Sequence, residues 1–238
     1  YPRASILIVT GSPVIHAFRL PQGIDYIKLP SLDRPNAEQY EPQFLAGCSE
    51  EIKQTRIAIL EKTIIGFAPD LLLVDKRAAG IDGELLGALK MLKSRNLPTK
   101  IVLGIRDILD EPSRTSKVLR ENGSFETIEK YYDEVWIYGV QEVFDAVKEY
   151  QFPNSVAKKT HYCGYLKRKI ENRIGGNGKL RLLATTGGGG DGSELVESFL
   201  ESLSILRKQT LVESTVIFGP QMPATSRDYF LRRYGNVA

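Results

Sequence analysis

The sequence has few cysteines and histidines, with two of each among 238 residues. Cys48 and Cys163 lie far apart and show no metal-ligand spacing, which argues against both a disulfide framework and a zinc site. A reducing compartment fits this cysteine usage best. His16 and His161 are isolated from each other, and a lone histidine is more often structural than catalytic, so we assign neither a role.

Long apolar runs and a strong charge excess are also missing. The longest uninterrupted runs, such as residues 6–9 and 71–74, are far shorter than the roughly 20 residues of a membrane-spanning helix. Lys and Arg number 32 against 29 Asp and Glu, and the resulting net charge of +3 is too small to indicate a nucleic-acid binder. We expect a soluble, cytoplasmic protein with no nucleic-acid partner. A peripheral contact with the inner face of the membrane stays open.

Short β-branched apolar runs alternate with helical patterns along the chain, which is typical of a parallel sheet connected by helices. Most of these runs are apolar throughout, as in a sheet covered on both faces. The predicted strands are residues 5–10, 26–29, 70–74, 100–105, 134–138, 180–185 and 215–218. The sequence therefore predicts an α/β protein.

Three helical stretches are clear, at residues 50–67, 83–96 and 193–208. In the first, apolar side chains recur at near-helical spacing, and only Arg56 interrupts the apolar stripe. Ser49 is placed to cap its start. The third helix is expected to begin directly after a run of glycines.

A change of composition marks a domain boundary. Residues 167–179 are basic, contain three glycines and have almost no apolar side chains, as an exposed linker would. We predict one α/β domain at residues 1–166 and a second at residues 180–238. The second has only about 60 residues, too few for a complete doubly wound domain, so we expect it to be truncated.

The strongest local signal is a glycine loop between the predicted strand 180–185 and the helix 193–208. The loop consists of Gly187, Gly188, Gly189, Gly190, Asp191, Gly192 and Ser193. Glycines let the backbone approach a diphosphate, and free N–H groups at a helix start favour bound anions. The run fits neither the dinucleotide fingerprint nor the nucleoside-triphosphatase loop. We predict phosphate binding here, with an ordinary surface turn as the alternative.

A second candidate site follows the predicted strand 100–105. Arg106 and Asp107 end this strand in polar residues, and open α/β sheets bind ligands at the carboxyl ends of their strands. Both are candidate catalytic residues, although Asp107 fits a helix cap or a salt bridge equally well. Asp75 and Lys76 follow another strand and are weaker candidates. Tight turning accounts for the Gly and Pro residues at 219–223.

The run Thr-Thr-Gly-Gly-Gly-Gly-Asp-Gly at residues 185–192 resembles the donor-domain loop of GT-B glycosyltransferases related to the peptidoglycan N-acetylglucosaminyltransferase. Five further segments are similar to a branch of predicted glycosyltransferases in that superfamily, so that the resemblance covers essentially the whole chain. They are Ile-Leu-Ile-Val-Thr-Gly-Ser-Pro at 6–13, Ala-Phe-Arg-Leu-Pro at 17–21, Tyr-Ile-Lys-Leu-Pro at 26–30, Asp-Leu-Leu-Leu-Val-Asp-Lys at 70–76 and Asp-Glu-Val-Trp-Ile-Tyr-Gly at 133–139. The resemblance implies two Rossmann-like domains, with the acceptor bound by residues 1–166 and the nucleotide sugar by residues 180–238.

Proteins of this type usually begin with a strand and a loop of Gly-x-Gly-His type, whose histidine is the usual candidate for the catalytic base. Nothing of that kind precedes Ser5, and the expected ribose- and uracil-contacting segments are absent after Ala238. The resemblance therefore implies a first domain without its opening strand and loop, and a chain that lacks the base histidine. Residues 1–238 alone are expected to be inactive.

The function implied by the resemblance is that of an inverting hexosyltransferase. It would move a hexose or N-acetylhexosamine from a nucleotide diphosphate, expected to be UDP, to a hydroxyl of a carbohydrate or lipid-linked acceptor. The UDP-sugar is a substrate, and we expect neither a cofactor nor a metal, because backbone N–H groups of the glycine loop would stabilise the departing diphosphate. Two alternatives stay open, a sugar-nucleotide epimerase of the same fold and a non-catalytic nucleotide-binding module.

Overall fold

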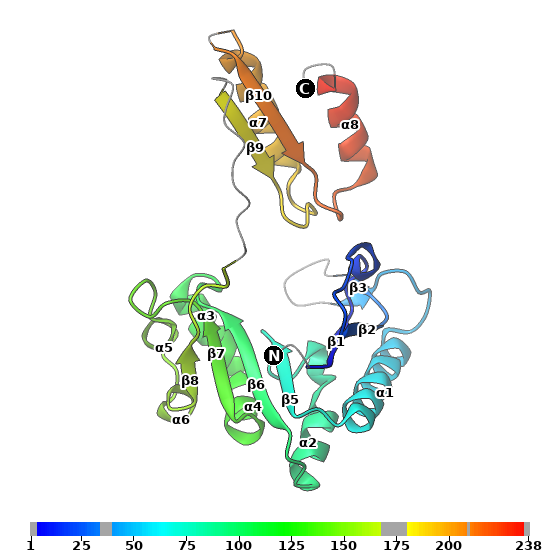
Figure 1. Cartoon of the computed structure of the whole chain (residues 1–238), viewed down its shortest axis with the longest axis vertical. Helices are drawn as coiled ribbons and strands as arrows, with labels where there is room; N and C mark the ends of the chain where they lie inside the picture. Colours follow the sequence, from blue (N-terminus) through cyan, green and yellow to red (C-terminus); the bar gives the residue numbers. More distant parts are fainter. Residues whose placement is uncertain (1–3, 34–39, 168–179, 209, 236–238) are drawn as a thin grey trace. The chain divides into compact units, whose positions relative to one another are not determined.

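The computed structural model describes residues 4–33, 40–167, 180–208 and 210–235. It divides into two compact units, Tyr1–Arg168 and Lys169–Ala238, each with its own hydrophobic core (Figure 1). Except for residue 167, the predicted linker 167–179 lies outside the described residues. No helix within the described ranges is long and apolar enough to cross a membrane.

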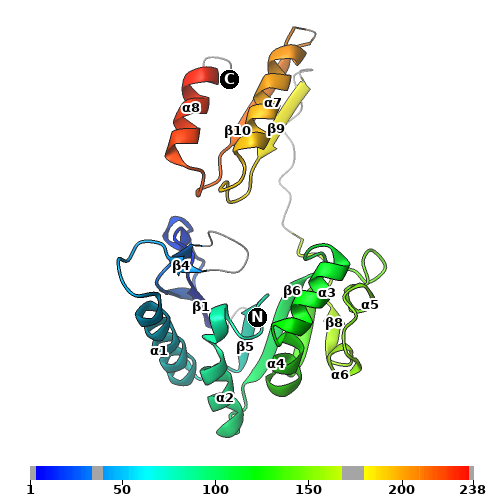
Figure 2. The same cartoon turned by 180° about the vertical axis from the view of Figure 1, so that it is seen from behind.

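The centre of unit 1 is a parallel four-stranded sheet with helices on one side. In order across the sheet, its strands are β5 (Leu71–Asp75), β6 (Lys100–Arg106), β7 (Glu134–Tyr138) and β8 (Thr160–Tyr162). Figure 2 shows α2 (Leu86–Ser94) and α4 (Ser124–Tyr131) in front of this sheet. Their apolar residues join those of β6 and β7 in the core.

The two faces of this sheet are covered unequally. Strand β6 is buried from Ile101 to Ile105, as expected for a strand covered on both faces. Along β5, alternate side chains are exposed, and Leu71 and Leu73 are 42% and 47% accessible. The expectation of covered strands therefore holds for β6 and is wrong for β5.

The other strands in the described part of unit 1 form two separate pairs. β1 (Ile6–Thr10) pairs in parallel with β2 (Ile24–Lys28), and β3 (Leu32–Asp33) pairs antiparallel with β4 (Glu41–Pro42). Val9 and Leu29 contribute to the same core as the four-stranded sheet. The remaining helical segments of unit 1 are η1 (Ile15–Ala17), α1 (Ser49–Phe67), η2 (Ile81–Gly83), α3 (Pro112–Glu121), α5 (Ala146–Glu149) and α6 (Asn154–Ala157).

Arg56, which interrupts the apolar stripe of α1, is buried with a buried partner. Its Nε and Nη2 donate to the two carboxylate oxygens of Glu84 at 2.6 and 2.7 Å, and its Nη1 donates to the carbonyl of Pro30 at 2.5 Å. A bidentate pair of this kind satisfies both charges in a site with little water. The polar residue in the apolar stripe therefore links α1 to the end of η2 and to the segment after β2.

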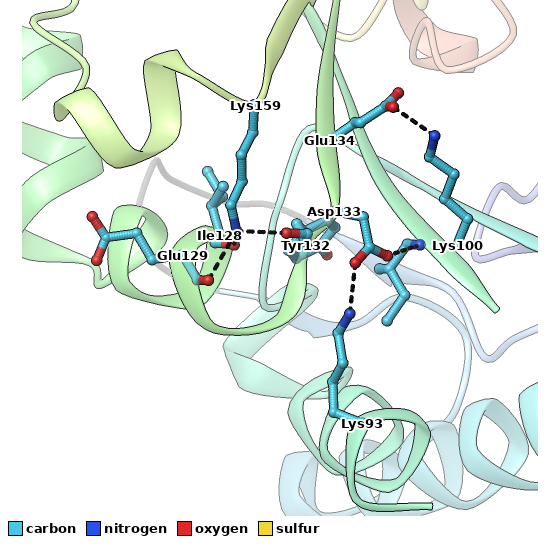
Figure 3. A network of polar contacts seen from close by, with 9 residues as sticks. Lys93, Lys100, Ile128, Glu129, Tyr132, Asp133, Glu134 and Lys159 are labelled. Atoms are coloured by element: carbon cyan, nitrogen blue, oxygen red, sulfur yellow. Dashed lines mark hydrogen bonds and ion pairs between the residues drawn. The ribbon is translucent and has the colours of Figure 1, made fainter. Parts of the chain in front are cut away.

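Ion pairs connect the amino ends of β6 and β7, the edge opposite to the one where such folds bind ligands (Figure 3). The carboxylate of Asp133 accepts from Lys93 Nζ at 2.8 Å and from the backbone N–H of Ile101 at 2.7 Å. Glu134 accepts from Lys100 Nζ at 2.5 Å. Burial alone would raise the pKa of Asp133, but the hydrogen bonds from Lys93 and Ile101 and the nearby lysine charges lower it overall.

The side chain of Lys159 caps the C-terminal end of α4 at the same edge. Its Nζ donates to the backbone carbonyls of Tyr132 at 2.8 Å and Glu129 at 3.0 Å (Figure 3). A cation at a helix C-terminus satisfies orphan carbonyls and the negative end of the dipole. This edge of unit 1 therefore has a structural role.

In its described residues, 180–208 and 210–235, unit 2 contains two parallel strands and two helices. They are β9 (Leu180–Thr185), α7 (Ser193–Leu206), β10 (Val212–Ile217) and α8 (Ala224–Tyr234). Val196, Leu200 and Leu203 of α7 pack with Phe230 of α8 against one face of the sheet. On the other face Leu183 is 62% exposed, so these strands too are covered on one face only.

The structure confirms the predicted α/β class, with every predicted strand and helix present and small shifts of their ends. The predicted helix 83–96 is shortened to Leu86–Ser94, because Gly80, Asp82 and Gly83 adopt positive φ before it and Asn96 after it. Ser49 does not cap α1, since the N-cap is Cys48, whose side chain makes no cap hydrogen bond.

Candidate functional site

The glycine loop of unit 2 connects the carboxyl end of β9 to the start of α7. Gly187 and Gly189 have φ of +59° and +88°, a region that favours glycine because it has no Cβ. Within the loop, Gly189 N donates to Thr186 O at 3.1 Å, and Gly192 N donates to Gly189 O at 3.3 Å. These bonds turn the chain compactly from strand into helix.

The loop packs backbone to backbone against the segment that follows β10. A Cβ on Gly219 would lie 2.2 Å from the carbonyl carbon of Gly188, and one on Gly189 would lie 2.8 Å from the Cα of Gly219. Gln221 N donates to Gly188 O at 2.8 Å, and Gly219 N donates to Thr186 Oγ1 at 3.2 Å. Gly219 therefore supports the glycine loop, beyond the tight turning expected from the sequence.

The glycines of this loop have different roles. A Cβ on Gly192 would lie 2.4 Å from the Cβ of Thr186, so Gly192 is needed for close packing. A Cβ on Gly190, in contrast, would meet no atom within 4 Å, and the φ of this residue is not positive. Asp191 is exposed and Ser193 is partly buried. Gly190 is therefore the position where an added side chain leaves the loop undisturbed.

The amino end of α7 follows directly on the glycine loop. Its N-cap is Gly192, which has no side chain to accept a hydrogen bond from the first-turn N–H groups. Uncapped N–H groups and the positive end of the helix dipole attract phosphate or carboxylate. Glu194 in the first turn also benefits from this dipole. A diphosphate here would contact backbone groups.

In unit 1, polar residues gather at the carboxyl edge of the four-stranded sheet. Asp75 ends β5, Lys76 follows it, Arg106 ends β6 and Asp107 follows that strand. Lys76 N donates to Gly104 O at 2.8 Å, which extends the pairing of the two strands by one bond. The structure thus places all four sequence candidates of unit 1 at one edge.

Asp107 is held by two donors. Its Oδ1 accepts from the backbone N–H of Ile108 and its Oδ2 from the hydroxyl of Tyr165, both at 2.8 Å. A Cβ on Gly139 would lie only 2.5 Å from the Cβ of Asp107, so the glycine after β7 provides space for this side chain. Arg106 is exposed beside it.

The helix-cap alternative for Asp107 is wrong. Glu111 is the N-cap of α3, and its carboxylate accepts from the backbone N–H groups of Ser113 at 3.0 Å and Arg114 at 2.8 Å. These bonds, led by the one from Arg114, lower the pKa of Glu111. The Asp107 carboxylate is therefore not used to cap α3 and lies at the sheet edge.

Two tyrosines that the sequence did not single out shape this edge. Tyr150 is fully buried, and its hydroxyl accepts from Leu109 N at 2.8 Å, which anchors the loop after Asp107. Tyr138 lies across Gly104, where a Cβ would come within 2.0 Å of the phenol oxygen. Burial, with the charge of Asp75, raises the pKa of Tyr138.

The carboxyl ends of β1 and β2 form a smaller polar group. Ser31 Oγ donates to Gly11 O at 3.1 Å and accepts from Lys28 Nζ at 2.7 Å. Burial and the nearby Arg56 lower the pKa of Lys28. The two histidines are exposed, His16 in η1 and His161 in β8. In the described part of the chain, no three His, Cys, Asp or Glu side chains gather as a metal site would require.

Comparison with known proteins gives a structural likeness without a sequence match. No protein-family model matches the chain, and no curated protein matches it in sequence. Among solved structures, the chain resembles S. aureus MnaA in a co-structure with UDP, at 11% identity and a TM-score of 0.50. The comparison covers 96% of this chain, which spans 65% of the MnaA chain. At this identity the likeness shows a shared Rossmann-like α/β fold.

Proposed function

We propose that this chain belongs to a nucleotide-sugar enzyme of GT-B type. The enzyme transfers a hexose or N-acetylhexosamine from a UDP-sugar to a hydroxyl acceptor and releases UDP. The observation that carries the proposal is the glycine loop, with the uncapped start of α7 behind it. The fold shared with a UDP-bound protein supports the choice of nucleotide.

The glycine loop would bind the diphosphate through backbone N–H groups. In sugar transfer, negative charge develops on the diphosphate as the bond to the sugar breaks. N–H donors and a helix dipole fixed in advance stabilise that charge without reorganising during the step. The packing of Gly219 against Gly188 holds these donors in place.

Unit 1 would bind the acceptor at its carboxyl edge. Asp107 is an acceptor-only group when ionised, suited to receive a hydrogen bond from a sugar hydroxyl. Arg106 is exposed at the same edge and would neutralise an anionic group on the acceptor. The roles of both residues follow from their position, in line with ligand binding at strand ends.

Epimerisation of a UDP-sugar is the second candidate, because likeness to a UDP-bound fold supports any enzyme that uses this nucleotide. Product analysis separates the two. The complete natural protein would be incubated with UDP-N-acetylglucosamine and with UDP-glucose, with and without sugar and lipid-linked acceptors. Release of UDP with glycosylated acceptor supports transfer, whereas an epimeric UDP-sugar without free UDP supports epimerisation. No product, together with no binding of any uridine nucleotide, would refute both.

A further inference from the structure

Tyr165 makes a hydrogen bond between distant parts of the sequence. Its hydroxyl donates to Asp107 Oδ2 at 2.8 Å, across 58 residues. The hydrogen bond to Asp107 raises the pKa of Tyr165, because losing the phenol proton would remove the donor and place two negative charges together.

The backbone after β8 is shaped to bring Tyr165 to this position. Cys163 N donates to Ile137 O at 2.9 Å, and Gly164 N donates to Gly139 O at 3.0 Å, so the chain follows β7 beyond its last strand residue. Gly164 then turns with a φ of +72°. The phenol consequently meets the carboxylate beside Gly139, the residue that makes room for Asp107.

This contact contributes little to the hydrophobic core. Tyr165 is 56% exposed, and polar pairs in water stabilise a fold only weakly. Its main effect is on the orientation of the carboxylate, which Ile108 N holds from the other side. The buried hydroxyl of Tyr150 fixes the same loop two residues further on.

We propose that Tyr165 is a positioning residue, which holds the Asp107 carboxylate with its free lone pairs available to a substrate hydroxyl at the sheet edge. This inference rests on the proposed function. Each carboxylate oxygen can accept two hydrogen bonds, so Oδ1 and Oδ2 retain one place each beyond their bonds to Ile108 and Tyr165. A substrate hydroxyl that donates to either carboxylate oxygen therefore meets an acceptor that is held in one orientation.

Turnover tests this role in the complete natural protein with UDP-N-acetylglucosamine as the probe. Tyr165→Phe removes only the hydroxyl, and we expect kcat to fall roughly tenfold or more with little change in KM for the nucleotide sugar, because a charge-assisted hydrogen bond is lost away from the glycine loop. In an Asp107→Ala background, where no side-chain oxygen is left for Tyr165 to hold, the same change should have little further effect, because both variants remove the same interaction.

A matched control is available on α8. Tyr229 is also exposed and its hydroxyl donates to a carboxylate, Glu197 Oε1, at 3.0 Å. Tyr229→Phe removes the same kind of bond outside the proposed acceptor edge, together with the one that its hydroxyl accepts from Arg233, and kcat should stay unchanged. Equal kcat in Tyr165→Phe, Tyr229→Phe and unaltered protein would overturn the positioning role.

A titration separates this inference from the proposed function. With tyrosine labelled at Cζ by ¹³C, the Tyr165 signal, assigned by its loss in Tyr165→Phe, should titrate above the ordinary tyrosine range and shift down in Asp107→Asn. Identical titration in Asp107→Asn would show that Tyr165 does not hold Asp107, whatever the substrate. If Tyr165 and Asp107 titrate as predicted here but the protein turns over no nucleotide sugar, the proposed function is refuted. The substrate role of Asp107 is then refuted with it.

Discussion

Gly219 and Gly188 are packed so closely that a Cβ on Gly219 would lie 2.2 Å from the carbonyl oxygen of Gly188. The contact joins the ends of β9 and β10, so the conformation of the glycine loop depends on a residue from the far end of the next strand in the sequence. The glycine loop is therefore held rigidly against the segment that follows β10. An anion site made of backbone groups requires such rigidity.

The first prediction concerns this contact. Gly219→Ala should destabilise unit 2 by about 1–3 kcal/mol, the usual cost of inserting an extra group into a packed region. Gly190→Ala should change stability by much less, because its Cβ meets no atom within 4 Å. Urea denaturation of the two variants and the unaltered protein, followed by the far-UV signal, measures the difference. Equal midpoints for Gly219→Ala and Gly190→Ala would contradict the close packing of Gly219.

The second prediction concerns the buried pair of Arg56 and Glu84. Arg56→Met leaves the Glu84 carboxylate without its bidentate partner and should cost about 3–5 kcal/mol. The double variant Arg56→Met with Glu84→Leu removes both charges and should recover much of that loss. Chemical denaturation of the single and double variants tests this, and a double variant less stable than Arg56→Met would be inconsistent with a charge-driven effect.

The third prediction is a dependence of stability on pH at Asp133. The folded protein holds the pKa of this carboxyl below its unfolded value, so at acidic pH the unfolded chain binds more protons. The contribution of Asp133 is therefore complete above the ordinary pKa of about 4 and is lost as pH falls through the folded value.

Thermal unfolding between neutral and acidic pH measures this effect. Asp133→Asn should have a lower Tm than the unaltered protein at neutral pH. The difference in Tm between the two should become smaller as the pH falls. Glu142→Gln, which removes an exposed carboxylate, serves as the control. A gap between Asp133→Asn and unaltered protein that stays constant with pH would argue against this linkage.

The fourth prediction concerns Tyr150 and the loop after Asp107. Tyr150→Phe removes the acceptor of the Leu109 N–H, which should cost about 1 kcal/mol and loosen the loop. Amide hydrogen exchange at Leu109 should become faster, while exchange within β6 should change little. Unchanged protection of Leu109 would mean that Tyr150 does not anchor this loop.

The sequence predicted those elements whose side chains repeat regularly. Strand β6 and helix α7 have long apolar patterns, and both appear where expected. Helices α3 and α4 were not among the three clear helical stretches, because α3 in particular is dominated by polar side chains and buries only Thr115 and Ser116. Their helical form depends on local caps such as Glu111 and on packing between elements.

The candidate sites were predictable as strand ends and as a glycine run, but their supporting residues were not. Tyr165 and Gly139 meet Asp107 only after distant segments come together, and nothing in their sequence context indicates this. Gly219 likewise meets the glycine loop only after distant segments come together. Arg56 was visible in the sequence as the polar residue in an apolar stripe, but its buried partner Glu84 was not predicted.

The most direct test of the central claim is a titration of residues 1–238, labelled with ¹⁵N, with UDP and separately with uridine. If the glycine loop binds the diphosphate, UDP should shift the backbone amide signals of Gly190, Asp191 and Ser193 in a saturable manner, and uridine should not. Gly190→Val should weaken this response at least tenfold while the rest of the spectrum is retained, and Gly66→Val, at another glycine with open space around it, should not. UDP-induced shifts located away from the loop, or an unchanged response in Gly190→Val, would contradict the account.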